Sequence, residues 1–250
     1  MKFKAIITDL DRTLLKNDKS ISEKGIDTIR KLKKKGILFM AATARPYRSI
    51  TEYDSLLGFD GAVCLNGAEI RCKDKIFSNG IDRKQAEGFL EALLINGKYT
   101  ISAEINGILY ANDYFPQWES VYYTDFPFLP DGIIHKILVT YTATDYEFIK
   151  SILPEDLYCT IANRTLIQIM DKNANKLNGI TKMLSMYGID ISESVYFGDD
   201  HDDIPPIINC GLGVAVENAI EQVKSAADIV VSSNENDGVT DFIMNHILKD

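Results

Sequence analysis

The amino-acid sequence predicts an α/β protein, in which a parallel sheet is covered by helices and interrupted by an inserted α+β segment. Short apolar runs alternate with helical periodicity at both ends of the chain, a pattern typical of β-α-β units. The middle of the chain carries a hairpin signal instead. The 250 residues, 46% of them hydrophobic, suffice for one or two packed domains.

The N-terminal part begins with an apolar run that ends in carboxylates. Helical periodicity then starts at the N-cap candidate Ser22 and stops at Gly36. In chain order, we predict a strand at residues 3–10, a helix at 22–35, a strand at 37–42, a helix at 46–57 and a strand at 62–65.

The last third of the chain repeats this alternation. The predicted elements are a helix at residues 176–187, a strand at 194–197, a helix at 203–209, a strand at 213–216, a helix at 219–226, a strand at 229–232 and a helix at 239–248. Both ends of the chain are therefore expected to form one Rossmann-like core.

The middle of the chain follows a different pattern. Residues 100–104 and 108–111 alternate around Asn106-Gly107, which is a strong signal for a two-residue hairpin turn. A strand at 136–142, a helix at 146–153 and strands at 158–162 and 166–170 complete a small α+β sheet. We therefore divide the chain into a core of residues 1–81 and 173–250 and an α+β cap domain of residues 82–172.

Charge and cysteine content exclude several classes of protein. The chain has 27 Lys and Arg against 36 Asp and Glu, a net charge of −9, which disfavours nucleic acid and anionic membranes as partners. The four cysteines lack the spacing of a zinc site or a disulfide framework. No signal peptide or membrane span is recognisable, so we expect a cytoplasmic protein. Its oligomeric state is not indicated.

Two carboxylates lie at the end of the first predicted strand. Side chains two apart on a strand point to the same side, so Asp9 and Asp11 are expected to converge. Ligands of open α/β sheets bind beyond the carboxyl ends of the strands, and paired carboxylates there suit Mg²⁺. The alternative is that one Asp caps a turn and the other is solvated.

Other polar residues follow further strands. Thr43 ends the second strand beside Pro46, where a helix start could bind an anion, although Thr43 could equally be a helix cap. Lys176 opens a helix and could equally face solvent. Residues 199–203 hold four Asp, whose repulsion calls for a cation. His201 lies among them but is not assigned a role.

Taken in order, these motifs resemble the haloacid dehalogenase superfamily, specifically the Cof-type phosphatases with a large cap between the second and third motifs. Residues 9–15 are similar to the first motif, Thr43-Ala44-Arg45 to the second, Lys176 to the third and residues 198–203 to the fourth. The segments 213–219, 227–228 and 237–239 are also similar to the family, so the resemblance covers essentially the whole chain.

The resemblance implies a Mg²⁺-dependent phosphatase acting on small phosphorylated metabolites such as sugar phosphates. Asp9 would attack phosphorus and form an aspartyl phosphate, and Asp11 would be the acid and base. Asp9, the backbone carbonyl of Asp11 and Asp199 would hold the metal. The phosphate would be bound by Thr43, Lys176 and the backbone amides around Leu10 and Ala44, with Asp203 acting behind the ligands.

Two positions depart from the family pattern. Arg12 stands where the family usually has Gly, so a long cation could reach the mouth of the site. Asp202 stands where an Asn usually helps to hold the phosphate, and its carboxylate would repel a phosphate dianion. Either Asp202 turns toward the metal or solvent, or turnover is poor.

Two other functions are compatible with these residues. A phosphomutase of similar architecture would return the phosphoryl group to its substrate, releasing no free phosphate. A weakly active binder of phosphorylated ligands would fit the two departures, although such a protein has no use for an acid and base at Asp11.

Overall fold

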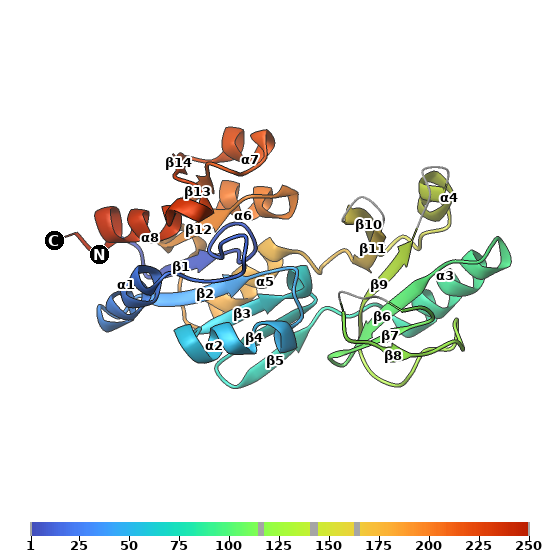
Figure 1. Cartoon of the computed structure of the whole chain (residues 1–250). Coiled ribbons are helices and arrows are strands. Elements are labelled where there is room, and N and C mark those ends of the chain that lie inside the picture. Colours follow the sequence, from blue (N-terminus) through green and yellow to red (C-terminus); the bar gives the residue numbers. More distant parts are fainter. Residues whose placement is uncertain (1, 115–117, 141–144, 163–165, 250) are drawn as a thin grey trace. The chain divides into compact units, whose positions relative to one another are not determined.

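The computed structural model describes residues 2–114, 118–140, 145–162 and 166–249. The chain divides into two compact units, Met1–Phe77 with Asn175–Asp250, and Ser78–Ala174. The predicted cap, residues 82–172, lies within the second unit (Figure 1). Residues 141–142, at the end of the strand predicted at 136–142, lie outside the described residues. Residues 163–165, between the strands predicted at 158–162 and 166–170, also lie outside them.

The first unit is built on an eight-stranded sheet in the order β14-β13-β12-β1-β2-β3-β4-β5. The strands from β14 to β3 are parallel, and β4 runs antiparallel to β3. Their bounds are β1 Ala5–Thr8, β2 Leu38–Ala42, β3 Gly61–Cys64, β4 Glu69–Cys72, β5 Lys75–Ser78, β12 Ser194–Gly198, β13 Leu212–Val216 and β14 Ile229–Val231. The central strands are buried on both faces, as their nearly continuous apolar sequences require.

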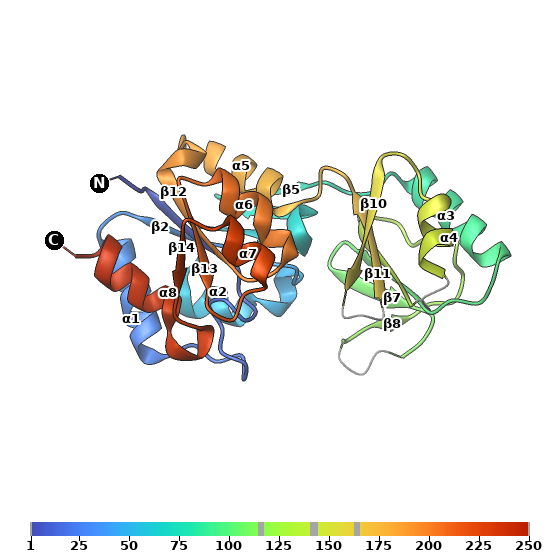
Figure 2. The ribbon, with the colours of Figure 1, turned by 90° about the horizontal axis from the view of Figure 1, so that it is seen from above.

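Helices cover both faces of this sheet (Figure 2). On one face α1 (Glu23–Lys34) contacts α2 (Thr51–Leu57) and α8 (Gly238–Phe242), and on the other α6 (Ile204–Asn209) contacts α5 (Lys176–Ser185) and α7 (Glu221–Ala226). Short 3-10 turns precede α2 and α6, at Tyr47–Ser49 and His201–Asp203, and a π-turn at Ile243–Ile247 follows α8. The helices predicted at 46–57, 203–209 and 239–248 are thus each divided in two.

Local signals set the ends of α1. The Ser22 side chain accepts a hydrogen bond from the Gly25 amide, which caps the helix, and Gly36 with φ +77° follows its last turn. The fold class predicted from the sequence, an α/β core with an added α+β element, is therefore confirmed.

The second unit is a six-stranded, mainly antiparallel sheet in the order β10-β11-β9-β6-β7-β8. Its strands are β6 Ile101–Ile105, β7 Ile108–Ala111, β8 Val121–Tyr122, β9 Ile134–Thr140, β10 Leu157–Ala162 and β11 Leu166–Asp171. The helices α3 (Arg83–Ile95) and α4 (Asp145–Ser151) share an apolar core with the sheet. Asn106 and Gly107 both have positive φ, so β6 and β7 form the predicted hairpin.

Two negative findings concern the described part of the chain. None of its helices combines the length and apolar character needed to cross a bilayer. All four cysteines are free thiols.

Candidate active site

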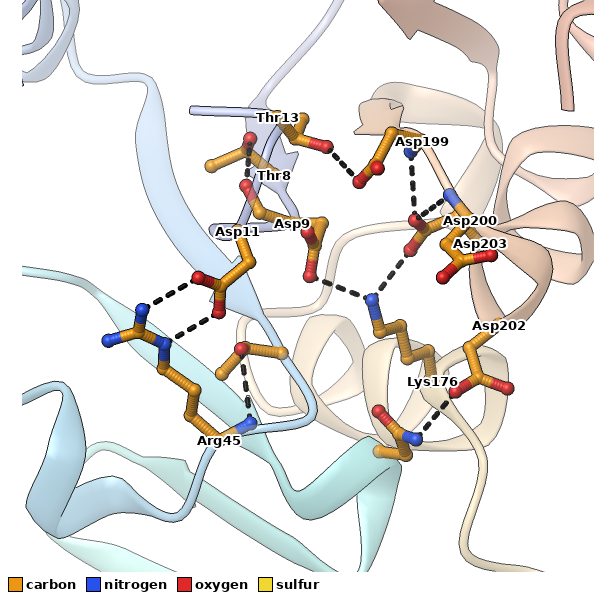
Figure 3. Close-up of polar contacts among 12 residues, drawn as sticks. Thr8, Asp9, Asp11, Thr13, Arg45, Lys176, Asp199, Asp200, Asp202 and Asp203 are labelled. Atoms are coloured by element: carbon orange, nitrogen blue, oxygen red, sulfur yellow. Dashed lines mark hydrogen bonds and ion pairs between the residues drawn. The ribbon is translucent and has the colours of Figure 1, made fainter. Parts of the chain in front are cut away.

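A buried ion cluster lies where β1, β12 and α5 meet. Lys176, the first residue of α5, places its Nζ 2.8 Å from Asp9 Oδ1 and 2.6 Å from Asp203 Oδ1 (Figure 3). The side chains of Lys176, Asp9 and Asp203 are only 4%, 8% and 1% exposed. The Asn175 side chain caps the helix by accepting from the Asn178 amide, which fixes the helix start and hence Lys176.

Asp203 holds the loop that follows β12. Its Oδ2 accepts hydrogen bonds from the Asp199 and Asp200 amides at 2.9 and 3.0 Å, and its Oδ1 also accepts from the Tyr196 hydroxyl. Gly198 is needed for this approach, because a Cβ there would lie 2.4 Å from the Asp203 Cβ. Asp203 therefore orients the loop and Lys176 together.

Asp199 completes the cluster. One of its oxygens accepts from the Thr13 hydroxyl at 2.8 Å, and the other lies 4.0 Å from Arg12 Nε. Arg12 adopts a left-handed backbone with φ +61°, the conformation in which Gly is the least strained residue. The departure from the family pattern at Arg12 therefore places a cation near Asp199.

The charges of this cluster fit a divalent cation. Carboxylate oxygens of Asp9, Asp199 and Asp203 lie within 4.8 Å of one another. Three buried carboxylates face the buried ammonium of Lys176 and the more exposed guanidinium of Arg12, which leaves an excess of negative charge. Hard oxygen ligands of this kind suit Mg²⁺.

Burial and crowding shift the acid-base behaviour of these groups. Burial, together with the neighbouring Asp203, raises the pKa of Asp199 to about 6. Burial also raises the pKa of Asp9, although the adjacent Lys176 opposes this. Burial alone would lower the pKa of Lys176, but the carboxylates of Asp203 and Asp9 outweigh it, so the pKa is raised and the ammonium form persists.

The Asp11 side chain has partners of its own, different from those of Asp9, Asp199 and Asp203. Its carboxylate accepts two hydrogen bonds from Arg45, both 2.6 Å long, and one of 2.7 Å from Lys19. Because β1 ends at Thr8, strand alternation does not set the direction of Asp11, whose carboxylate points to Arg45 (Figure 3). The convergence of Asp9 and Asp11 on one metal stays a prediction.

The cations around Asp11 change its acidity. Burial raises the pKa of Asp11, but the hydrogen bonds from Arg45 and Lys19 outweigh it and leave the pKa lowered. In this arrangement Asp11 is held as a carboxylate, the form of a base.

The phosphate-binding candidates near β2 lie at its carboxyl end. Thr43 is buried, and its hydroxyl accepts a hydrogen bond from the Arg45 amide at 3.2 Å. Leu10 is buried after β1, whereas Ala44 is exposed. Pro46 precedes a 3-10 turn, Tyr47–Ser49, and the short α2 begins only at Thr51.

Asp202 is half-buried, and its carboxylate binds the turn after β3. Its Oδ2 accepts a hydrogen bond of 2.6 Å from the side-chain amide of Asn66, in the turn after β3. His201 is exposed. Reasoning from the sequence included Arg45 in the second motif but missed its contact with Asp11. It also missed Asn66 and Tyr196 as neighbours of the site, although the adjacent Asn66-Gly67 pair is a turn signal that marks the end of β3.

The chain matches the family of haloacid dehalogenase-like hydrolases over residues 6–243. It belongs to this family. It is 27% identical to the 5-amino-6-(5-phospho-D-ribitylamino)uracil phosphatase YitU of Bacillus subtilis, over 95% of each chain. It is 26% identical to the phosphoglycolate phosphatase of Methanopyrus kandleri, over 95% of this chain and 94% of the relative.

Solved structures support the fold of this haloacid dehalogenase-like hydrolase. The sugar phosphatase BT4131 of subclass IIB superposes with a TM-score of 0.84 at 19% identity, covering 98% of this chain and all of that one. The family resemblance stated from the sequence is therefore confirmed. The named activities of these relatives agree with the predicted enzyme class, a phosphoric monoester hydrolase.

Proposed function

We propose that this chain is a Mg²⁺-dependent phosphatase that hydrolyses small phosphomonoesters through an aspartyl phosphate on Asp9. The observation that supports this most strongly is the buried contact of Lys176 with Asp9 and Asp203, beside Asp199. A lone buried carboxylate is costly, whereas one held against an ammonium in a polar cluster is positioned to react.

Asp9 would carry the covalent step. One oxygen is bound to Lys176, and the other would attack phosphorus. As the new P–O bond forms, the bond to the leaving oxygen breaks, and that oxygen keeps the electron pair and takes a proton from Asp11. Water would then attack the aspartyl phosphate, giving its proton to Asp11 and releasing inorganic phosphate and free Asp9.

Asp11 must change partners during this cycle. While Arg45 and Lys19 hold it as a carboxylate, it can accept a proton from water but has none to give. We infer that the acid step requires Asp11 to release at least one of these cations and take up a proton.

The metal would be held by Asp9, Asp199 and the backbone carbonyl of Asp11. When bound, Mg²⁺ supplies the positive charge that offsets repulsion between an anionic nucleophile and an anionic phosphate. Asp203 has both oxygens engaged in hydrogen bonds, so we assign it to orienting Lys176 and the Asp199 loop.

The transferring oxygens would be bound by Lys176, the Thr43 hydroxyl and the backbone amides of Leu10 and Ala44. Negative charge spreads over these oxygens in the transition state, so their binding lowers the barrier. Asp202 stands in a family phosphate-binding position, and its carboxylate would be tolerated because Asn66 binds it.

The substrate class follows from the relatives and from charge. One solved relative is named a sugar phosphatase and another relative a phosphoglycolate phosphatase, so we propose small phosphorylated metabolites, with sugar phosphates first. Residues 82–172 would act as the cap that excludes water. The net charge of −9 disfavours nucleic acid and anionic membranes, and we propose a cytoplasmic location.

The test is phosphate release from a panel of phosphorylated metabolites by the purified full chain with Mg²⁺. We expect release from at least one sugar phosphate, its loss on chelation, and its loss in Asp9→Asn. An isomerised sugar phosphate without free phosphate would instead identify a phosphomutase. Failure both to release phosphate from an aryl ester and to trap beryllofluoride on Asp9 would leave only a binding function.

A further inference from the structure

We propose that Asn66 is a positioning residue of the phosphate site, which binds Asp202 and turns its carboxylate away from the transferring phosphoryl group. This inference rests on the proposed phosphatase function. The contact is the 2.6 Å hydrogen bond from Asn66 Nδ2 to Asp202 Oδ2, drawn at Asp202 in Figure 3. An amide that donates to a carboxylate makes a charge-assisted bond, stronger than a neutral one.

The turn that carries Asn66 touches three parts of the site. The Leu65 amide donates to the Arg45 carbonyl at 3.0 Å, and the Asn66 amide donates to the Thr43 carbonyl at 3.0 Å. A Cβ on Gly67 would lie 2.3 Å from the Asn175 carbonyl oxygen, next to Lys176. Asn66 is therefore fixed against the ends of β2 and α5 while its side chain reaches Asp202.

The turn is also costly to form. Leu65 and Asn66 both have positive φ, 49° and 52°, a conformation that is strained for a leucine. Asn66 is 2% exposed, and its Oδ1 is buried without a hydrogen-bond donor among the described residues. The opposite amide orientation would place that oxygen against the Asp202 carboxylate, so the bond to Asp202 determines how the amide is turned. Strain of this kind gathers at functional sites.

The hydrogen bond from Asn66 explains how an acidic residue can occupy position 202 beside a phosphate site. A free carboxylate beside the Lys176 and Asp203 pair would repel a phosphate dianion. With its Oδ2 bound to Asn66, Asp202 is held at the turn after β3, and the amide dipole offsets part of its charge. Asn66 acts through Asp202 and has no contact with reacting atoms in this assignment.

The experiment exchanges the two ends of the hydrogen bond. Asn66→Asp places two carboxylates face to face without disturbing the backbone, because Asp tolerates positive φ as Asn does. Asn66→Asp with Asp202→Asn restores an amide–carboxylate bond with its ends reversed. Asn96→Asp is the matched control, since Asn96 is an exposed residue of the second unit whose amide donates to the Ala92 carbonyl.

We expect Asn66→Asp to raise KM and weaken inorganic phosphate binding by roughly 10- to 100-fold, the range of one charge-assisted hydrogen bond, with a smaller change in kcat. The double variant should return both to within about 5-fold of the parent. Phosphate binding is measured by calorimetry with Mg²⁺, and thermal unfolding verifies that every variant is folded.

Three results separate the possibilities. A folded Asn66→Asp variant that binds phosphate like the parent overturns the proposal. So does a double variant that stays as weak as Asn66→Asp. If the parent releases no phosphate from any ester, the proposed phosphatase function fails, and the phosphate-binding comparison still decides the role of Asn66.

Discussion

Asp9 and Asp11 are two residues apart, yet they occupy opposite environments. The Asp9 side chain is 8% exposed, contacts one ammonium and has a pKa raised by burial. The Asp11 side chain is 36% exposed, and Arg45 and Lys19 outweigh its burial and lower its pKa. Identical side chains are thus pushed apart in acidity by what surrounds them, a pattern associated with separate acid-base roles.

The difference also shows which charge is unbalanced around each of the two aspartates. Around Asp9, carboxylates outnumber cations, so a bound divalent cation would neutralise the excess charge on this side. Around Asp11, two cations face one carboxylate, so this side can accept an anionic ligand that competes with Asp11 for Arg45 or Lys19. A divalent cation would satisfy the first need, and the phosphomonoester dianion would satisfy the second.

The largest effect expected is the loss of turnover in Asp9→Asn. The amide still accepts a hydrogen bond from Lys176 but is no nucleophile, so we expect kcat to fall by at least about 10⁴-fold with every ester tested. Steady-state phosphate release measures this, and circular dichroism verifies the fold. Asp27→Asn, an exposed position on α1, is the control. A variant that keeps half of the activity would refute the nucleophile assignment.

Asp11→Asn should slow the hydrolysis of the aspartyl phosphate with every ester, but should spare its formation from an aryl phosphate. Losing a general acid and base costs about 10²–10⁴-fold, but an aryl phosphate has a leaving group that needs no proton. We therefore expect a burst of aryl alcohol close to one equivalent of enzyme, then slow turnover as the aspartyl phosphate accumulates. Stopped-flow absorbance measures the burst. Equal losses for alkyl and aryl esters, without a burst, would contradict the separate roles of Asp9 and Asp11.

Much of the core could be predicted because its signals are local. The apolar runs that became β1, β2 and β3 and the caps of α1 lie in short segments of sequence. Parallel strands bring their carboxyl ends to one edge, so Asp9, Thr43 and Asp199 were expected near one another. The structure joins Asp9 to Lys176 and Asp199 to Thr13, while the roles of these residues stay predictions.

The missed elements have identifiable causes. In β4 and β5 the charged residues Arg71 and Lys75 interrupt the apolar pattern, and their hairpin turns at Lys73-Asp74, which lacks glycine. The helix α3 could have been predicted, because Ala86, Phe89, Leu90 and Leu93 follow helical spacing and are buried.

The partners of Asp11 and Asp202 could not be predicted from local sequence. The bonds to Arg45 and Asn66 join residues 34 and 136 positions apart. They depend on where loops turn after the strands end, and neither hydrophobic periodicity nor strand alternation describes such loops.

Asp199→Asn tests the excess charge around Asp9. The pKa of Asp199 is raised to about 6, so its stabilising contribution is full below its ordinary pKa of 3.8 and is lost as pH rises through about 6. Without metal, we expect the variant to be more stable than the parent above about pH 6, by at most about 3 kcal/mol, with no difference below pH 3.8.

Added Mg²⁺ should reverse this order by stabilising the parent more than Asp199→Asn. Thermal unfolding with Mg²⁺ and with a chelator measures both effects. Asp131→Asn, at an exposed position of the second unit, should show neither. A metal-free Asp199→Asn protein less stable than the parent above about pH 6 would mean that the cluster is already balanced in charge.

Arg45→Gln is expected to have the smallest effect, a change of kcat within about 10-fold. It tests whether the cations around Asp11 set the acidity that distinguishes Asp11 from Asp9. Removing the guanidinium takes away two of the three hydrogen bonds that Asp11 accepts from cations, so the pKa of Asp11 should rise. Asp11 then keeps its proton to higher pH, and the alkaline limb of kcat for an alkyl phosphate should move upward. The pH profile of phosphate release measures this shift, with Arg30→Gln on the exposed face of α1 as the control.

The stability of Arg45→Gln relative to the parent should depend on pH in the opposite sense to that of Asp199→Asn. A carboxyl with a lowered pKa contributes stability above its unfolded-state pKa and loses it as pH falls through the folded-state value. Arg45→Gln should therefore be less stable than the parent near neutral pH, and the difference should vanish in acid. If instead the alkaline limb stays in place while stability falls, Arg45 supports the loop without controlling the proton on Asp11, and the contrast with Asp9 is one of structure alone.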